Sequence, residues 1–257
     1  MISFAATEMS SFGYLCHFQT DNGDEFFANC SSTSPVIGSS VIAYPTYEEL
    51  VQGQNSSAVT ISKLLPPLPP TNNSIYCVGL NYRSHAKEAN GELVFVTSRE
   101  CRDVTPEQAS QYILGYTVGN DLSCRFFQLP EQSGGQFFYA KAFDKFAPIG
   151  PVLVSPDVFA KTRTSATLVT RINGVVKQDT VIGKDMIFSP ERVLSWMSQS
   201  TTIPAYTVVM TGTPAGAGVF QTPRQLLKDG DHIEVEISGL GTLKNVVRFE
   251  EGQDSIL

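Results

Sequence analysis

Residues 79–96 read GLNYRSHAKEANGELVFV, a polar segment of helical character that runs directly into an apolar strand sequence. His85 and Glu88 are three residues apart, a spacing that places both side chains on one face of the helix we expect over residues 81–89. Glu92 follows at the head of the apolar run. A base that can activate water, followed by an oxygen ligand, is the combination that a metal-assisted attack on a carbonyl requires. Because such pairs are also common on solvated helix faces, the pattern alone favours a structural interpretation.

A proline-rich segment divides the chain into two regions. Residues 1–63 alternate short apolar runs with turn-rich polar stretches, which predicts a small β-rich N-terminal lobe. Residues 64–73 read LLPPLPPTNN, whose prolines exclude a helix and a sheet interior, so we expect an extended connector. Recognition by an SH3-type domain is the alternative interpretation of this segment. Residues 74–257 then form the main domain, because a chain of 257 residues is long enough to bury a large core.

Two helices of the main domain are marked by their caps. Thr105 is expected as an N-cap, with Gln108 completing a capping box and Gly115 just past the helix end. A second helix is expected to begin at Ser189-Pro190. Its apolar stripe, expected in the core, comprises Val193, Leu194, Trp196 and Met197.

Strand signals dominate the rest of the main domain. The pair Asn173-Gly174 lies between the apolar runs 168–172 and 175–178, which predicts a hairpin with a type I′ turn. In residues 232–237 every second residue is Val or Ile, which predicts a strand with one buried face. Few helices and many strands, without regular βαβ alternation, predict an α+β fold built as a mixed β-roll.

The composition excludes several functional classes. A net charge of −7 without a basic cluster argues against a nucleic-acid partner. The five cysteines are scattered, which argues against a disulfide framework and a zinc knuckle. No apolar run approaches the length of a membrane span, and the N-terminus lacks the pattern of a secretory signal. We therefore expect a cytoplasmic protein, with the mitochondrion as the alternative location.

Polar residues follow a strand sequence in the stretch GYTVGNDLSCRFFQ, residues 115–128. Asp121 comes directly after the apolar run, a good position for a metal ligand, although an Asp that closes a turn is the alternative. Arg125 and Gln128, close behind, are candidates for substrate binding. Lys141 lies in the aromatic stretch FFYAKAFDKFAPIGP and could hold an oxyanion or a carboxylate, although most lysines are simply solvated.

A loop of small residues follows another strand sequence. Residues 211–218 read TGTPAGAG, and their glycines allow the main chain to approach a ligand closely. Gly212 and Thr213 can present a backbone N–H and a hydroxyl to an anion, so both are candidates for substrate binding. No GK[ST] sequence follows, which argues against nucleotide binding.

The order of these motifs is similar to that of one known family. From the N-terminus, the segments that carry the resemblance are GLNYRSHAKEA, GELVFV, GYTVGNDLSCRFFQ, KAFDKFAPIGP, RINGVVKQD, VVMTGTPAGAG and LKDGDHIEVEISGLGTLKN. In this order they resemble the fumarylacetoacetate hydrolase superfamily, in particular its acylpyruvate hydrolase and oxaloacetate decarboxylase or tautomerase branch. The resemblance extends from about residue 64 to the C-terminus, and the N-terminal lobe is similar to the one that precedes this core.

The resemblance implies a mixed β-roll that forms a homodimer and holds Mg²⁺ or Mn²⁺ between three carboxylates. Two of these come from an ExE motif on one strand, and the third is Asp121. The cation would chelate the keto and carboxylate oxygens of an α-keto acid. By motif, His85 and Glu88 would activate water or shuttle protons, Lys141 would stabilise the enolate, and Thr213 would bind the substrate carboxylate.

The chain departs from the family pattern between the HxxE helix and the ExE strand. Family members carry a few tens of residues there, which form a lid over the substrate, whereas here HAKEAN runs directly into GELVFV. Aligned on GEL, Glu92 is the second Glu of the ExE motif and Asn90 replaces the first. An Asn oxygen can ligate a cation, but it is neutral, so weaker metal binding is expected.

Three hypotheses follow for function. The first is a metal-dependent hydrolase or lyase acting on a β-dicarbonyl or an α-keto acid, by acylpyruvate-type C–C hydrolysis or by oxaloacetate decarboxylation or tautomerisation. The second is a catalytically impaired member that keeps the fold as a binding or structural subunit. An isomerase on the same scaffold is the third, because one fold supports many chemistries.

Overall fold

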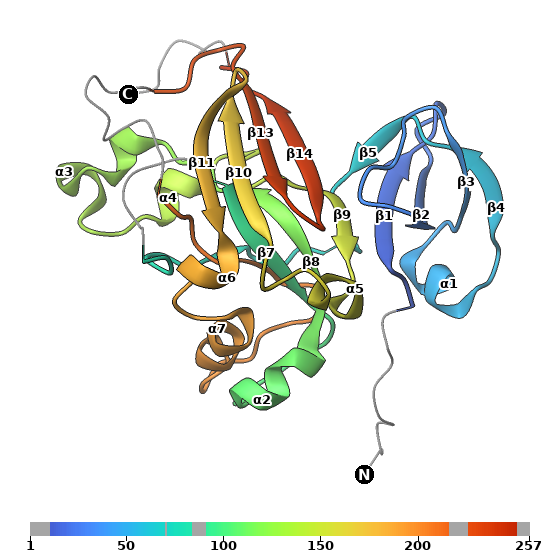
Figure 1. Cartoon of the computed structure of the whole chain (residues 1–257), viewed down its shortest axis with the longest axis horizontal. Helices are drawn as coiled ribbons and strands as arrows, with labels where there is room; N and C mark the ends of the chain where they lie inside the picture. The colour runs from blue at the N-terminus through green and yellow to red at the C-terminus, as the bar shows by residue number, and fades with distance from the viewer. Residues whose placement is uncertain (1–10, 70, 84–90, 216–225, 251–257) are drawn as a thin grey trace.

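The structure, a computed structural model, describes residues 11–69, 71–83, 91–215 and 226–250 (Figure 1). His85, Glu88 and Asn90 therefore lie outside the described residues. Within the described segments, the largest sheet has the strand order β2-β1-β9-β8-β7-β12-β6, and β5 pairs with β1 beside this path. Its strands are β1 (Tyr14–Gln19), β2 (Glu25–Cys30), β5 (Lys63–Leu65), β6 (Tyr76–Cys77), β7 (Gly91–Thr97), β8 (Ile113–Asn120), β9 (Ile149–Val154) and β12 (Val208–Met210).

A second sheet packs against the strands at the centre of the first (Figure 1). Its strand order is β11-β10-β13-β14, all antiparallel. The core between the two sheets contains Leu93, Phe95, Val118, Leu168 and Val235, all buried. The strands of the second sheet are β10 (Thr167–Ile172), β11 (Val175–Val181), β13 (His232–Ile237) and β14 (Gly241–Val246). This arrangement confirms the predicted α+β fold with mixed sheets.

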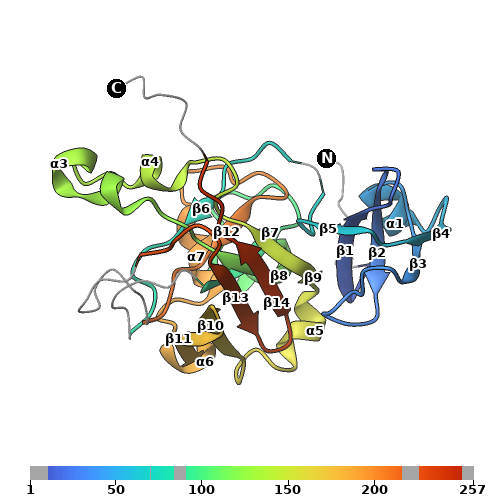
Figure 2. The same ribbon diagram turned by 90° about the horizontal axis from the view of Figure 1, so that it is seen from above.

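Short helices surround the two sheets, as the view from above shows (Figure 2). They are α1 (Tyr47–Gln52), α2 (Pro106–Ala109), α3 (Pro130–Ser133), α4 (Phe138–Lys141), α5 (Pro156–Ala160), α6 (Ile182–Asp185) and α7 (Pro190–Met197), with 3₁₀ turns η1 (Ser110–Tyr112) and η2 (Arg125–Gln128). In the described part of the chain, none of these helices has the length and apolar character needed to cross a bilayer.

The predicted hairpin and the predicted alternating strand are both confirmed. Asn173 and Gly174 have φ angles of 50° and 79°, the left-handed backbone that a type I′ turn requires. Ile233, Val235 and Ile237 on β13 are buried on the face toward the core. Local sequence determines both features, because turn chemistry and the period of two operate over a few residues.

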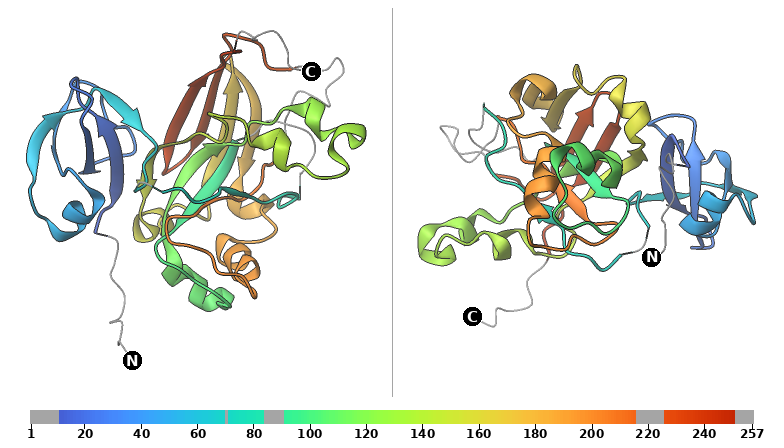
Figure 3. Two further views of the ribbon diagram at one scale, coloured as in Figure 1. Left: turned by 180° about the vertical axis from the view of Figure 1, so that it is seen from behind. Right: turned by 90° about the horizontal axis from the view of Figure 1, so that it is seen from below.

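The N-terminal lobe contains β1, β2, α1 and the two-stranded sheet of β3 (Ser40–Ala43) and β4 (Ser57–Thr60), beside the main body (Figure 3). Strand β1 also pairs with β9, through Tyr14 with Val154 and Leu15 with Leu153, so the large sheet runs from the lobe into the main body. The division at residues 63 and 74 stays a prediction.

Three local expectations were wrong. Asn81–Arg83, at the start of the expected helix, are not helical, and Tyr82 forms a β-bridge with Met186. The helix capped by Thr105 has the expected capping box but ends at Ala109. Gly115 lies inside β8, where an added Cβ would lie 2.7 Å from the carbonyl oxygen of Val154, so close strand packing rather than a helix end explains this glycine.

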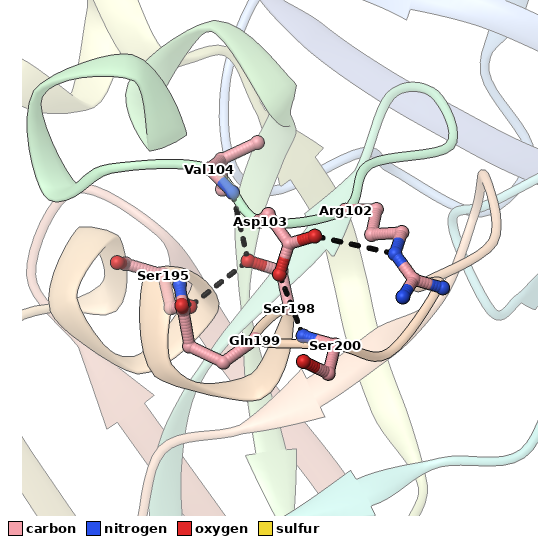
Figure 4. Close-up of polar contacts among 7 residues, drawn as sticks. All are labelled: Arg102, Asp103, Val104, Ser195, Ser198, Gln199 and Ser200. Carbon is pink, nitrogen blue, oxygen red and sulfur yellow. Dashed lines mark hydrogen bonds and ion pairs between the residues drawn. The ribbon is translucent and has the colours of Figure 1, made fainter.

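The apolar stripe expected on α7 is only partly in the core. Val193 and Leu194 are buried, but Trp196 is 81% exposed. The C-terminal end of α7 is held by a polar cluster (Figure 4). The Ser198 hydroxyl accepts from the Val104 N–H at 3.2 Å and donates to the Ser195 carbonyl at 2.9 Å, and an Asp103 carboxylate oxygen accepts from the Ser200 N–H at 2.6 Å. Helix α7 therefore packs against the body through Val193 and Leu194 and through the hydrogen bonds at its C-terminal end.

Candidate active site

Glu92 is the second residue of β7, and it lies opposite Gly119 of β8. Its side chain is buried, with the residue 2% exposed, and its Oε2 atom accepts a hydrogen bond of 2.8 Å from the Gly212 N–H. Burial raises the pKa of Glu92 well above its usual value, and the negative charge of Asp121 raises it further, whereas the Gly212 N–H and Lys141 act in the opposite direction. Folding therefore places this carboxylate where its charge is poorly stabilised.

Asp121 follows β8 directly, as the sequence predicted, and its carboxylate is buried. Its Oδ2 atom forms an ion pair with the Nζ atom of Lys141, which α4 supplies from twenty residues further along the chain. Its Oδ1 atom is buried and has no hydrogen-bond partner among the described residues. Since buried carboxylate oxygens normally have a partner, this atom points to a ligand position.

The loop after β12 brings Gly212 and Thr213 to the start of β7. The Thr213 hydroxyl donates to the Gly91 carbonyl at 3.1 Å. Gly212 has a φ of +95°, and an added Cβ would lie 3.0 Å from the Val78 carbonyl oxygen and 3.1 Å from the Asn81 Cβ atom. A glycine is needed here because the loop passes so close to residues 78–81.

Arg125 and Gln128 form a pair on η2, in which the Arg125 guanidinium donates to the Gln128 side-chain oxygen. Burial lowers the pKa of Arg125 to about 10. The Cys124 N–H donates to the Ala140 carbonyl at 2.8 Å, which joins this turn to the helix that carries Lys141. The structure thus keeps the predicted substrate-binding pair on the segment that links Asp121 to Lys141.

Comparison with known proteins places this geometry in a family. A family model described as "Fumarylacetoacetate (FAA) hydrolase C-terminal" matches residues 88–248, more than half of the chain. The chain belongs to the fumarylacetoacetate hydrolase family. The "Fumarylacetoacetate hydrolase domain-containing protein 2 homolog" of Dictyostelium discoideum is 33% identical over 230 residues, which cover 72% of this chain and 74% of the relative. The "Oxaloacetate tautomerase fahd2, mitochondrial" of Xenopus laevis is 31% identical and covers 74% of this chain and 70% of the relative.

Solved structures of the fumarylacetoacetate hydrolase family share the fold. A fumarylacetoacetate hydrolase from Exiguobacterium antarcticum superposes with a TM-score of 0.76 at 27% identity, covering 92% of this chain and 99% of that one. A 5-carboxymethyl-2-hydroxymuconate delta-isomerase from Mycobacterium smegmatis gives a TM-score of 0.71 at 25% identity, with 93% and 100% coverage. The relatives and neighbours named here include a hydrolase, a tautomerase and an isomerase, so the family is one of enzymes.

The fumarylacetoacetate hydrolase family implies a divalent cation, and the described residues fit one. Two buried carboxylates, Glu92 and Asp121, lie close enough for the second to raise the pKa of the first, and Asp121 Oδ1 lacks a partner in the described part of the chain. No set of three or more His, Cys, Asp or Glu side chains converges within the described ranges, and Asn90 lies outside them. Two carboxylates are sufficient for Mg²⁺, which is often held by one or two carboxylates together with water and substrate oxygens.

Two buried amide side chains at this site were not predicted. Asn81 donates to the carbonyls of Phe188 and Thr211, each at 2.9 Å, and accepts from the Phe188 N–H at 2.7 Å. It thereby joins residue 81 to Phe188 and to the start of the loop that carries Thr213. Gln178 is the second, within the family motif RINGVVKQD. Sequence alone could not identify either residue, because their partners lie far away along the chain.

Proposed function

We propose that the protein is a divalent-metal-dependent enzyme that acts on an α-keto acid or a β-dicarbonyl compound. Keto–enol tautomerisation of an oxaloacetate-like acid is the reaction that we favour. The observation that carries this proposal is the convergence of two buried carboxylates beside Lys141, with Asp121 Oδ1 left without a partner in the described segments. The names of the relatives from Xenopus laevis and Bos taurus, oxaloacetate tautomerases, support the choice of reaction.

In this proposal, Glu92 and Asp121 hold Mg²⁺ or Mn²⁺, with Asn90 as a neutral third ligand expected from the sequence. When bound, the cation supplies a Lewis acid for the keto oxygen of the substrate. The Gly212 N–H keeps Glu92 in place, because it donates to the carboxylate oxygen at 2.8 Å. A direct contact between Gly212 and the substrate, expected from the sequence, stays a prediction.

The other side chains orient the substrate and balance its charge. Lys141, already paired with Asp121, provides a positive charge beside the oxygen that becomes an enolate. Arg125 and Gln128 bind polar groups of the substrate from the η2 turn, and Thr213 binds its carboxylate. Tautomerisation then requires only that one proton leave the carbon next to the carbonyl and that one be added to the keto oxygen, or the reverse. By motif this proton transfer is assigned to His85 and Glu88, which lie outside the described residues.

C–C hydrolysis or decarboxylation is the second candidate, because an enolate, here that of pyruvate, would also be the leaving group or first product of either reaction. A substrate with a cleavable bond distinguishes these candidates. We expect purified protein with Mn²⁺ to speed the keto–enol equilibration of oxaloacetate, followed by ultraviolet absorbance, more than it speeds pyruvate formation. Faster pyruvate formation would assign decarboxylation, and an acylpyruvate consumed with carboxylic acid release would assign hydrolysis.

Metal binding tests the proposal against a catalytically impaired family member. Isothermal calorimetry with Mn²⁺ should detect one site per chain, and Asp121→Asn should weaken its affinity at least about 100-fold, because it removes a charged ligand. Asp157→Asn is the matched control, since it removes the same charge from the exposed first turn of α5. The absence of any heat at millimolar Mn²⁺ would favour the impaired binding subunit.

We also propose that the protein forms a homodimer through an aromatic arm, defined as residues 125–143, which includes η2, α3 and α4 and projects from the body (Figure 2). Ring contacts join Phe127, Tyr139 and Phe143 into one cluster. The exposed members of the arm are Phe126, Leu129, Phe137, Phe138, Tyr139 and Phe143. Exposed apolar patches of this kind usually mark an interaction surface.

Light scattering of variants tests this assembly. Phe138 and Trp196 are both 81% exposed, but only Phe138 belongs to the aromatic arm. Phe138→Glu should convert a dimer to a monomer, whereas Trp196→Glu should not change the molar mass. A monomeric wild-type protein would contradict the proposed dimer.

A further inference from the structure

Gln178, on β11, lies opposite Thr170 of β10 and is 1% exposed. Its Oε1 atom accepts from the Thr170 hydroxyl at 2.6 Å and from the Gly91 N–H at 3.2 Å. Its Nε2 atom donates to the Thr213 hydroxyl oxygen at 2.8 Å and to the Pro214 carbonyl at 2.9 Å. One buried amide thus connects the second sheet, the first residue of β7 and the loop that carries Thr213.

The orientation of this amide is fixed by backbone groups of known polarity. The Gly91 N–H can only donate, so the atom facing it is the amide oxygen. The Pro214 carbonyl can only accept, so the atom facing it is the amide nitrogen. Reversing the amide would place its N–H group against the Gly91 N–H and its oxygen against the Pro214 carbonyl oxygen. These buried groups would then lack hydrogen bonds, at a large cost in folding free energy.

The fixed amide in turn determines the polarity of the Thr213 hydroxyl. Because Nε2 is a donor only, the hydroxyl oxygen of Thr213 must accept from it, and the single hydroxyl hydrogen stays available for an acceptor. In this structure that acceptor is the Gly91 carbonyl, at 3.1 Å. A carboxylate is a stronger acceptor than a carbonyl and can draw the same hydrogen toward itself.

We propose that Gln178 is a positioning residue that presents Thr213 as a hydrogen-bond donor and so makes the site selective for a substrate carboxylate over its ester. The inference rests on the proposed function, in which Thr213 binds that carboxylate. Gln178 acts only through Thr213 and does not touch the substrate.

Close packing around Gly91 supports the hydrogen-bond arrangement of the Gln178 amide. An added Cβ on Gly91 would lie 2.3 Å from the Thr170 hydroxyl oxygen and 2.9 Å from Gln178 Oε1. Only glycine lets the backbone of β7 approach the amide this closely. This close approach allows the Gly91 N–H to donate to Gln178 and the Gly91 carbonyl to accept from Thr213.

Two substitutions of Gln178 test the inference. Gln178→Glu keeps the shape but replaces the donor with an acceptor, which would take the Thr213 hydrogen, and Gln178→Met removes both functions at similar volume. With Mn²⁺ present, either variant should raise KM for the keto acid about tenfold and leave kcat within about threefold, because a contact to a non-reacting carboxylate contributes uniform binding. The preference for the acid over its monoester should fall by a similar factor. Circular dichroism and thermal melting identify any variant that fails to fold.

A double-mutant cycle separates positioning from general structural damage. Thr213→Val removes the hydroxyl, so adding Gln178→Met to it should cause no further loss of affinity for oxalate, a non-reacting dicarboxylate, measured by calorimetry with Mn²⁺. Thr213→Ser, which keeps a hydroxyl, should bind oxalate within about threefold of wild type. Additive losses in the double variant, or unchanged affinity in the Gln178 variants, would overturn the inference while the proposed function stands. A wild-type protein that binds neither Mn²⁺ nor oxalate would overturn both.

Discussion

A buried glutamate and a partly buried one have opposite environments in this protein. Glu191, in the first turn of α7, receives two hydrogen bonds from the Arg163 guanidinium, at 2.5 and 2.8 Å. Burial alone would raise the pKa of Glu191, but the bonds and charge of Arg163 outweigh it and lower the pKa to about 2. Glu92, on β7, has Asp121 as a neighbour of the same charge, and its pKa is raised.

The difference separates a structural ion pair from a candidate cation site. The Arg163 fork matches the Glu191 carboxylate, so that pair is complete within the fold. In the other cluster, one ammonium from Lys141 faces two carboxylates, and its ion pair is with Asp121. A negative charge that the fold itself does not neutralise costs stability, and enzymes accept this cost where a ligand will restore the balance.

Acid titration should show the largest effect. The folded-state pKa of Glu191, about 2, lies below its ordinary value of 4.5. The stabilisation is therefore fully present above about pH 4.5 and is lost as the pH falls toward 2, with a total on the order of 3 kcal/mol. Urea unfolding at a series of pH values should show this loss in wild type and a smaller loss in Glu191→Gln. Equal slopes in the two proteins would mean that the pair does not stabilise the fold.

Breaking the ion pair at neutral pH should have the next largest effect. Glu191→Gln leaves the Arg163 guanidinium partly buried without its carboxylate, so we expect a loss of about 2 kcal/mol, less than for a fully buried pair. The urea midpoint measures this loss. Metal affinity should stay unchanged, because the pair lies outside the candidate active site. A change in affinity would show that the two clusters are not independent.

Neutralising Glu92 should stabilise the metal-free protein, whereas breaking the Arg163–Glu191 pair should destabilise it. Glu92→Gln removes a buried charge beside Asp121 while keeping an oxygen for the Gly212 N–H, so the metal-free protein should gain about 1 to 2 kcal/mol. Thermal melting in the presence of a chelator measures the gain, and Mn²⁺ should stabilise wild type but not the variant. A destabilised metal-free variant would show that the fold already balances this charge.

The smallest effect is expected at the uncharged Ser198 hydroxyl, which serves as a reference for the two charged clusters. Ser198→Ala removes the acceptor of the buried Val104 N–H at the end of α7 (Figure 4), which should cost about 1 kcal/mol in urea unfolding. Neither acid titration nor Mn²⁺ should alter this cost, because the hydroxyl carries no charge. A pH-dependent cost would mean that the charged clusters and this cluster are coupled.

Local sequence predicted some elements of the fold and not others. The Thr105 capping box and the Asn173-Gly174 hairpin were predicted because each depends on a few adjacent residues. Gly115 was assigned to a helix end because its role in β8 depends on Val154, a strand partner far along the chain. Trp196 follows the apolar period of α7, yet which part of that stripe is covered depends on neighbouring elements.

The same limit applies to the candidate active site. Asp121 and Glu92 were found because the family motifs contain them, and the structure brings them together with Lys141. The roles assigned to these residues stay predictions, as do those of His85, Glu88 and Asn90 outside the described ranges. Gln178 lies within the motif RINGVVKQD, but its role could not be predicted from the sequence, because its partners come from β7, β10 and the loop after β12.

The pairing of β1 with β9 has a mechanical consequence. The pairing at Tyr14 and Leu15 joins the N-terminal lobe to β9, which lies inside the large sheet between β1 and β8. A protease that cut the connector at residues 66–69 would therefore leave two fragments that still adhere to each other. Amide deuteration of β1 and β9 should then proceed at matching rates, as in a single cooperative block.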